Sequence, residues 1–219
     1  MKEIEKNTVS GDNQMINSSE IYFLGNNNAK KRILVLGNSI TRHGPSAEIG
    51  WEHDWGMAAS SLENDYVHRL YAMLKEKGED VYMFIRQASF WERNYLNPDI
   101  LLKYKADKNF GADIIIFRLG ENVPRENIVH FKSALEKLIK YLSNEMCKVV
   151  FTTCFWQFDG LDDGIRQVAK ETHMPLVELG ELGEDPEMKA LGLFWHEGVA
   201  NHPGDKGMEK IAERIFNAL

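Results

Sequence analysis

The chain has 219 residues, a formal net charge of −7 and no run of clustered lysine or arginine. This length suits one large domain with a sizeable core, and the acidic balance argues against a nucleic-acid-binding face. No apolar stretch is long enough to span a bilayer, and the polar first residues lack the apolar segment of a signal peptide. We therefore expect a cytoplasmic protein, or an exported one whose signal peptide has been removed.

Apolar runs alternate along the chain with segments of helical periodicity. Residues 1–30 are expected to form an N-terminal arm, with a short strand at 21–24, that packs on a main domain of residues 31–219. In that domain, apolar runs predict strands at 32–36, 81–85, 113–119, 148–153 and 175–179. Helical spacing and stop signals predict helices at 58–77, 98–104, 126–143, 164–172 and 206–219, with loops at 41–57 and 87–97. This alternation indicates right-handed crossovers, so we expect an α/β fold, a three-layer α/β/α sandwich with a parallel, flavodoxin-like five-stranded sheet.

Three short polar segments follow predicted strands or precede the last predicted helix. They read Gly37-Asn38-Ser39, Gly120-Glu121-Asn122 and His202-Pro203. The carboxyl ends of parallel strands meet at one edge of the sheet, where such folds bind ligands. Ser39 is a candidate nucleophile and His202 a candidate general base for its proton. The Asn122 amide and the Ser39 backbone N–H are candidate donors to an oxyanion.

Each of these residues also has a purely structural interpretation. Ser39 could serve only as a turn residue or helix cap, Asn122 could satisfy nearby backbone groups, and His202 could be a capping or surface histidine. The three segments taken together favour the catalytic interpretation. His43, His53 and His196 show no spacing with partners that defines a metal site, so we expect neither a metal nor another cofactor.

The order and spacing of the three segments resemble the SGNH (GDSL-like) hydrolases, a family of esterases and lipases. Members carry Gly-Asp-Ser or Gly-Asn-Ser after the first strand, Gly-x-Asn after the third and His-Pro before the final helix. The resemblance runs from about Arg32 to the end of the chain. It implies a serine esterase that works through an acyl-enzyme.

Two positions depart from the family pattern. Where the family places an aspartate three residues before the histidine, this chain has Val199. Glu197 is our candidate for the carboxylate that orients His202, a backbone carbonyl is the competing orienter, and Asp205 suits an N-cap of the last helix.

The second departure lies after the second strand, where the family has a glycine that donates a backbone N–H to the oxyanion. Residues 87–92 contain no glycine. A backbone donor between Ser89 and Trp91 could take its place, and we assign Trp91.

The five tryptophans fall in segments at or near the expected active edge, and Trp51, Trp55 and Trp195 are candidate walls of a substrate cleft. The competing interpretation is that long loops need a small core of their own. Charged residues of the same loops, which are Glu48, Glu52, Asp54, Glu92 and Arg93, suit a hydrophilic substrate. Within the family this favours hydrolysis of a short-chain, acetyl ester of a carbohydrate or similar small molecule, without nucleic-acid or membrane partners.

Three other functions compete with this one. The departures from the family pattern are compatible with a catalytically impaired carbohydrate-binding protein on the same scaffold. A lysophospholipase or thioesterase-type acyl hydrolase would use the same residues on a longer acyl chain. A nucleotide- or phosphate-binding domain is disfavoured, because the loop after the first strand lacks a glycine-rich cradle and a lysine.

Overall fold

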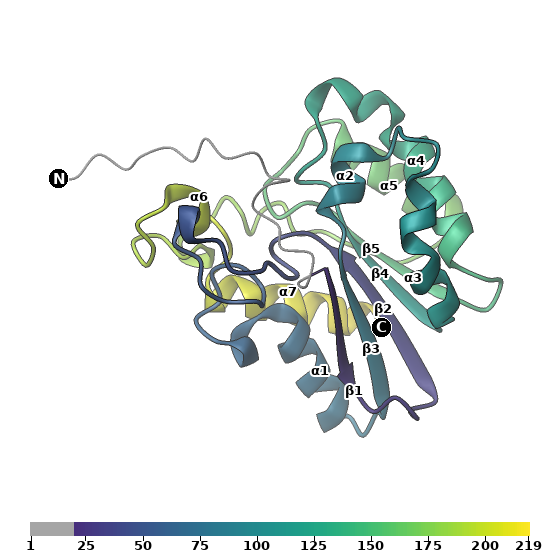
Figure 1. Cartoon of the computed structure of the whole chain (residues 1–219), viewed down its shortest axis with the longest axis horizontal. Coiled ribbons are helices and arrows are strands. Elements are labelled where there is room, and N and C mark those ends of the chain that lie inside the picture. The colour runs from purple at the N-terminus through teal and green to yellow at the C-terminus, as the bar shows by residue number, and fades with distance from the viewer. Residues whose placement is uncertain (1–19) are drawn as a thin grey trace.

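A computed structural model of the chain describes residues 20–219, and these form a single mixed sheet with helices on both faces (Figure 1). The sheet has the strand order β1-β3-β2-β4-β5-β6. Its strands are β1 (Ile21–Gly25), β2 (Lys31–Gly37), β3 (Val81–Gln87), β4 (Ile114–Arg118), β5 (Lys148–Thr152) and β6 (Leu176–Val177). All neighbours pair in parallel except β1, which pairs antiparallel with β3. The predicted three-layer fold with five parallel strands is therefore confirmed.

The edge strand β1 extends that parallel sheet by one antiparallel strand. It pairs with β3 from Ile21 opposite Arg86 to Gly25 opposite Tyr82, so the short strand predicted at 21–24 is confirmed. Residues 1–19 of the expected arm lie outside the described residues, and the division of the chain at residue 30 stays a prediction.

The helices divide between the two faces of the sheet. They are α1 (Tyr66–Glu76), α2 (Ser89–Asn94), α3 (Lys105–Phe110), α4 (Ile128–Leu142), α5 (Leu161–Thr172), α6 (Glu197–Ala200) and α7 (Asp205–Ala218). Leu34 and Leu36 of β2 face the core beneath α2, α3, α4 and α5, whereas Ile33 and Val35 face the core beneath α1 and α7 (Figure 1). Strands buried on both sides explain the continuous apolar runs. None of the described helices is both long and apolar enough to cross a membrane.

The helix predicted at 58–77 was placed too early, since α1 begins only at Tyr66. The Asp65 carboxylate accepts the backbone N–H of His68 at 2.8 Å and caps the helix there. Ala58 has a positive φ of 74°, which is incompatible with a regular helix. The segment before the cap is instead part of the loop region that follows β2.

Three helices were missed by the sequence prediction because they are too short to show a periodic apolar face. α2 lies inside the expected loop 87–97, α3 follows the expected short helix at 98–104, and α6 lies shortly before His202. A helix of four to six residues completes fewer than two turns, so apolar periodicity cannot identify it.

A buried ion pair joins β3 to α3 and closes one side of the molecule. Arg86 donates through Nε to one Asp107 oxygen at 2.8 Å and through Nη2 to the other at 2.5 Å. Both residues are buried. A bidentate pair of this kind satisfies both charges where water cannot reach them.

Substituting Asp107 by Ala leaves the buried Arg86 beside a cavity with only the longer 3.7 Å contact to Glu20 among the described carboxylates, and is expected to lower the free energy of unfolding by about 3 kcal/mol. Urea unfolding followed by circular dichroism measures the loss. Glu136→Ala is the control, because it breaks only an exposed ion pair within α4, and should leave the unfolding midpoint unchanged. Equal midpoints for Asp107→Ala and the wild type would contradict the assignment of this pair as a stabilising contact.

Candidate active site

Ser39 lies in a tightly bonded turn directly after β2. The N–H of Ala88 donates to the carbonyl of Gly37 at 2.6 Å, and the N–H of Met57 donates to the carbonyl of Ser39 at 2.9 Å. A Cβ on Gly37 would lie 1.8 Å from Oγ1 of Thr41, so only glycine lets the chain turn back this closely. The turn therefore holds the Ser39 backbone from both sides.

The side chains of Ser39 and His202 meet at this edge of the sheet. Ser39 Oγ lies 2.8 Å from His202 Nε2, and His202 Nδ1 lies 2.7 Å from the Gly198 carbonyl oxygen. A carbonyl oxygen only accepts, so Nδ1 carries the hydrogen, and in the neutral ring Nε2 accepts the Ser39 hydroxyl. The two residues thus form a serine–histidine dyad in the tautomer that proton transfer from serine requires.

The helix α6 supplies the carbonyl that orients the ring. The backbone N–H of His202 bonds the Val199 carbonyl at 3.0 Å, three residues back, rather than the Gly198 carbonyl four residues back. This tightening of the helix end leaves the Gly198 oxygen for the His202 ring. The orienting group is therefore a product of how α6 ends.

His196 holds the start of the same helix. Its Nδ1 accepts the backbone N–H of Val199 at 3.3 Å, and its ring is buried. A Cβ on Gly198 would lie 2.8 Å from the Cε1 atom of His196. Glycine at position 198 thus lets the His196 ring pack against the turn that orients His202.

The structure places neither Glu197 nor Asp205 in the role that the sequence suggested. The Glu197 side chain is exposed at the start of α6, and the Gly198 carbonyl stands at His202 Nδ1. This is the arrangement considered as the alternative to Glu197. Val199, where the family has aspartate, is buried in an apolar cluster. Asp205 is the first residue of α7 and accepts from the N–H of Ser60 at 2.8 Å and from its hydroxyl at 2.5 Å, so it ties the start of α7 to the loop region that follows β2.

Burial determines the protonation state of the His202 imidazole. It lowers the pKa of His202 to about 3, and positive charge on His43, Arg118 and His196 acts in the same direction. The hydrogen bond to Gly198 opposes this shift without cancelling it. The ring is consequently neutral at pH 7 and available as a base.

Asn122 lies in the turn after β4, at the same edge of the sheet as the Ser39–His202 dyad, and is half-buried. One hydrogen of its Nδ2 is donated to Glu92 Oε2 at 2.6 Å, which leaves the second hydrogen of that nitrogen for another acceptor. The role of Asn122 and of the Ser39 N–H as oxyanion donors stays a prediction.

Trp91 lies in the first turn of α2 with its indole buried against Tyr95 and Phe131, at ring-centroid distances of 5.4 and 6.0 Å. The side chain thus belongs to the core. Its backbone N–H remains the candidate donor, since first-turn N–H groups have no acceptor within their own helix.

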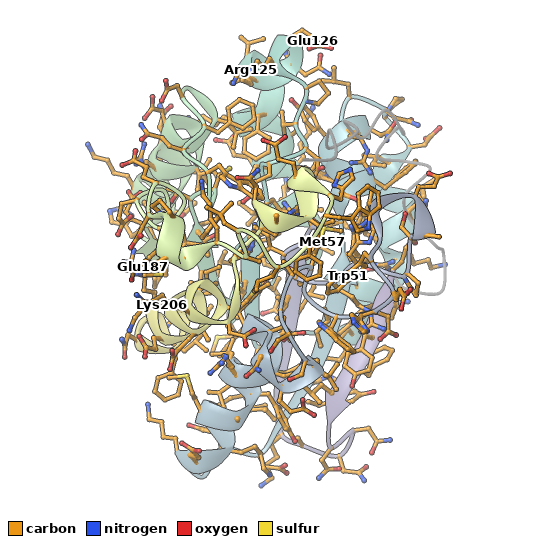
Figure 2. All side chains as sticks on the ribbon, turned by 90° about the vertical axis from the view of Figure 1, so that its left-hand side faces the viewer. Trp51, Met57, Arg125, Glu126, Glu187 and Lys206 are labelled. Atoms are coloured by element: carbon orange, nitrogen blue, oxygen red, sulfur yellow. The ribbon has the colours of Figure 1, made fainter. Side chains whose placement is uncertain are left out.

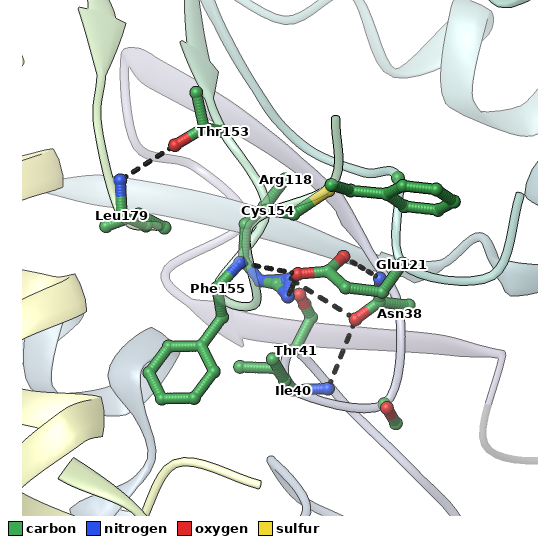
Figure 3. Close-up of polar contacts among 12 residues, drawn as sticks. Asn38, Ile40, Thr41, Arg118, Glu121, Thr153, Cys154, Phe155 and Leu179 are labelled. Atoms are coloured by element: carbon green, nitrogen blue, oxygen red, sulfur yellow. Dashed lines mark hydrogen bonds and ion pairs between the residues drawn. The ribbon is translucent and has the colours of Figure 1, made fainter. Parts of the chain in front are cut away.

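A polar network joins Asn38, the residue before Ser39, to Arg118 and Glu121 (Figure 3). Arg118 Nη1 and Nη2 bind one Glu121 oxygen at 2.9 and 2.6 Å, and the other Glu121 oxygen accepts from Asn38 Nδ2 at 2.5 Å. Asn38 Nδ2 also donates to Glu92 Oε1 at 3.0 Å. The sequence analysis placed Glu92 among the substrate-facing loop charges, and this was wrong, because Glu92 is 0% exposed. The sequence offered no signal for this burial, because α2 is too short to show which of its side chains face the core.

The candidate substrate-binding tryptophans have different environments. Trp51 is 0% exposed and packs with Met57 and Val199 in a small loop core (Figure 2). Because its ring is fully covered, it cannot contact a substrate directly. Trp55 is half-buried and stacks on His53 at 4.1 Å, whereas Trp195 is 55% exposed.

Trp156 was not among the predicted site residues, yet its ring packs edge-on against His202 at 5.1 Å. It follows β5, whose carboxyl end reaches the same edge of the sheet as that of β2. This neighbour of the dyad had no signal in the sequence beyond its place after a strand.

Metal-ligating side chains do not gather at this edge. Within residues 20–219, no group of three or more His, Cys, Asp or Glu residues is arranged to hold a metal ion. The site is therefore described by the chemistry of its own side chains.

Comparison with known proteins identifies the fold. Neither a protein-family model nor a curated protein sequence matches the chain. Among solved structures it is similar to a protein described as a GDSL-like lipase from Parabacteroides merdae, with 15% identity and a TM-score of 0.57 over 87% of this chain and 95% of that one. It is also similar to the esterase EstA from Pseudoalteromonas, with 13% identity and a TM-score of 0.51 over 86% and 96% of the two chains.

A third similar structure is a two-domain esterase active on acetylated mannans, with 18% identity and a TM-score of 0.54. The alignment covers 85% of this chain and 48% of that protein. The chain therefore has the fold of the SGNH (GDSL-like) esterases and lipases, as the resemblance in its sequence implied.

The lowered pKa of His202 predicts that its ring stays neutral at pH 5, where a histidine with the ordinary pKa of about 6.5 would be roughly 97% protonated. Nitrogen NMR of labelled imidazole, assigned with a His202→Asn variant, measures this directly. Nε2 should retain the shift of an unprotonated nitrogen and Nδ1 that of an N–H across pH 5–8. A His202 signal that titrates near pH 6.5 would contradict the effect of burial.

Proposed function

We propose that the protein is a serine esterase that hydrolyses a short-chain ester through an acyl-enzyme. The observation that carries the proposal is the 2.8 Å contact between Ser39 Oγ and His202 Nε2, with Nδ1 held by the Gly198 carbonyl at 2.7 Å. This contact joins a nucleophile to a base whose tautomer is fixed. The fold shared with GDSL-like esterases and lipases supports the same conclusion.

The reaction follows from this geometry. His202 Nε2 takes the Ser39 proton as Oγ bonds to the ester carbonyl carbon, and the carbonyl oxygen becomes an oxyanion. The bond to the leaving alcohol then breaks, and His202 returns the proton to that alcohol. Water attacks the acyl-serine by the same sequence, giving the carboxylic acid and free Ser39.

Three N–H groups supply the oxyanion site in this proposal. They are the backbone N–H of Ser39, the second Nδ2 hydrogen of Asn122 and the backbone N–H of Trp91. Fixed donors of this kind stabilise the negative charge that develops on the carbonyl oxygen, and each contributes about 10²–10³ in kcat.

The side chains around the dyad favour a polar substrate such as an acetylated carbohydrate. Trp195 is 55% exposed, and Trp156 presents a half-buried ring against His202. On the loop after β2, Arg42 binds the exposed Asp54 at 2.8 Å and places hydrogen-bonding groups near this edge. Aromatic rings beside polar groups suit sugar rings, and one structural relative is an esterase active on acetylated mannans.

A second candidate, a hydrolase of longer acyl chains, is favoured by the loop before α6. Leu191, Leu193 and Trp195 on this loop are all exposed. The loop is fixed to the dyad, because the N–H of Ala190 donates to the carbonyl of His202 at 3.0 Å. Exposed apolar side chains beside an ester-cleaving site suit an acyl chain.

Substituting Ser39 by Ala removes the nucleophile, and should lower turnover of 4-nitrophenyl acetate by more than about 10³-fold while leaving the circular dichroism spectrum unchanged. A fluorophosphonate probe should label the wild type and leave the variant unlabelled. Unchanged turnover in Ser39→Ala would overturn the proposed function. Glycan binding without any turnover by the wild type would instead favour the impaired carbohydrate-binding protein.

Glu197→Gln is measured beside Ser39→Ala, because it tests the orienting group. The Glu197 side chain is exposed and the Gly198 carbonyl stands at Nδ1, so we expect a change in kcat/KM of less than about twofold. A loss of about 10²-fold or more would restore a carboxylate role for Glu197.

The acyl preference separates the two substrate classes. If the polar and aromatic side chains around the dyad select the substrate, kcat/KM should fall at least about tenfold from acetyl to octanoyl 4-nitrophenyl esters. The enzyme should then also release acetate from acetylated mannan oligosaccharides. A rise with chain length, lost in a Leu191→Ser/Leu193→Ser variant, would favour the longer-chain hydrolase. Steady-state rates and acetate release measure the two outcomes.

A further inference from the structure

We propose that Glu92 is a positioning residue, whose ionised carboxylate holds the Asn122 amide in place as an oxyanion donor. The inference rests on the proposed ester hydrolysis, and adds to it the group that organises the oxyanion site. Glu92 is completely buried in α2, so its carboxylate acts on neighbouring protein groups rather than on a substrate.

Three N–H groups converge on this carboxylate. Oε1 accepts from the backbone N–H of Gly120 at 2.5 Å and from Asn38 Nδ2 at 3.0 Å, and Oε2 accepts from Asn122 Nδ2 at 2.6 Å. A carboxylate offers only acceptors and matches three donors. A protonated carboxyl would add an O–H donor that faces three other donors. The three hydrogen bonds therefore favour the ionised form of Glu92.

Two donors other than Glu92 fix the orientation of the Asn38 side-chain amide, which determines the direction of its hydrogen bond to Glu92. Its Oδ1 accepts from Arg118 Nη1 at 3.3 Å and from the N–H of Ile40 at 3.4 Å, contacts that Figure 3 shows together with Glu121. Its Nδ2 must therefore face the two carboxylates of Glu92 and Glu121. Glu92 therefore ties the residue before Ser39 to the turn that carries Asn122. One carboxylate sets the distance between the nucleophile and its oxyanion donor.

Among residues 20–219, no lysine or arginine forms an ion pair with Glu92. The groups that face it are Glu121 and Arg118 at the end of β4, Cys154 after β5 and Tyr104 before α3. Arg93, the next residue in α2, donates instead to Ser89 Oγ at 3.1 Å. Arg118 binds Glu121 through both of its terminal nitrogens. The network thus holds two carboxylates against one guanidinium.

Because two carboxylates share one guanidinium, the protonation state of Glu92 changes with pH in the neutral range. Burial, and then the neighbouring Glu121 carboxylate, raise the pKa of Glu92 to about 7. Because the ionised form accepts all three donors, activity should fall as pH decreases through about 7. His202 cannot produce that change, since its pKa is lowered far below this range.

Substituting Glu92 by Gln replaces one acceptor oxygen with an NH2 group that faces donors. We expect kcat to fall about 10- to 100-fold, less than or comparable to outright loss of one oxyanion donor, while KM changes less than about twofold. The decline of kcat near pH 7 should disappear in Glu92→Gln. Glu92→Asp keeps a carboxylate and should retain that decline. Glu136→Gln on the exposed side of α4 is the control.

A double-mutant cycle with Asn122→Ala separates positioning from general damage. If Glu92 acts through Asn122, Glu92→Gln should lower kcat no further in the Asn122→Ala background. Rates on 4-nitrophenyl acetate from pH 5 to 9 give all four corners of the cycle. Thermal unfolding checks that each variant is folded. If Glu92→Gln does not fold, Glu92→Asp replaces it in the cycle, because the shorter side chain moves the carboxylate away from Asn122 and should likewise lower kcat only when Asn122 is present.

Three results would overturn the inference. They are a wild-type kcat in Glu92→Gln, losses that simply add in the cycle, and a wild-type rate that does not fall as pH decreases through about 7. Failure of the proposed function shows differently, because turnover would then persist in Ser39→Ala. A wild type that depends on Ser39 but not on Glu92 would therefore reject this inference alone.

Discussion

The hydrogen bond from His202 Nδ1 to the Gly198 carbonyl oxygen is the contact on which the chemistry of this site depends. It fixes the tautomer of the ring and places Nε2 against Ser39, which are the tasks of the third member of a catalytic triad. A neutral carbonyl performs them with less electrostatic support than a carboxylate, because hydrogen bonds to charged groups are roughly twice as strong. Burial then dominates, and the pKa of His202 is lowered rather than raised.

Among the described residues, the buried carboxylates near the dyad bind Asn38 and Asn122, whereas a backbone carbonyl stands at His202 Nδ1. Glu92 and Glu121 are placed behind Asn38 and Asn122, where they hold amide groups instead of an imidazole. The two carboxylates therefore fix the side-chain amides of Asn38 and of Asn122, the proposed oxyanion donor, and the base is oriented by backbone. This division has a cost, since a carboxylate near an oxyanion opposes the charge that forms there. Arg118, bound to Glu121 and to Asn38, offsets part of it.

The sequence predicted the parts of this arrangement that side-chain identity determines. Strands buried on both faces appear as apolar runs, so the sheet and the positions of Ser39, Asn122 and His202 at its edge follow from the sequence. The orienting group could not be found in this way, because every residue has a carbonyl and only the end of α6 shows which one is free. Trp51 and Glu92 were misplaced for a related reason, as a residue's type does not reveal which side of a loop or short helix is buried.

Within residues 20–219 no carboxylate hydrogen-bonds the His202 ring, and the small loop core accounts physically for the rigidity of the dyad. Trp51, Met57 and Val199 pack together in this core, which joins the loop after Ser39 to the helix before His202. The N–H of Met57 holds the Ser39 carbonyl, and the Val199 carbonyl holds the His202 N–H. Both halves of the dyad are thus anchored to one set of buried side chains, so packing provides the preorganisation that an ion pair would otherwise supply.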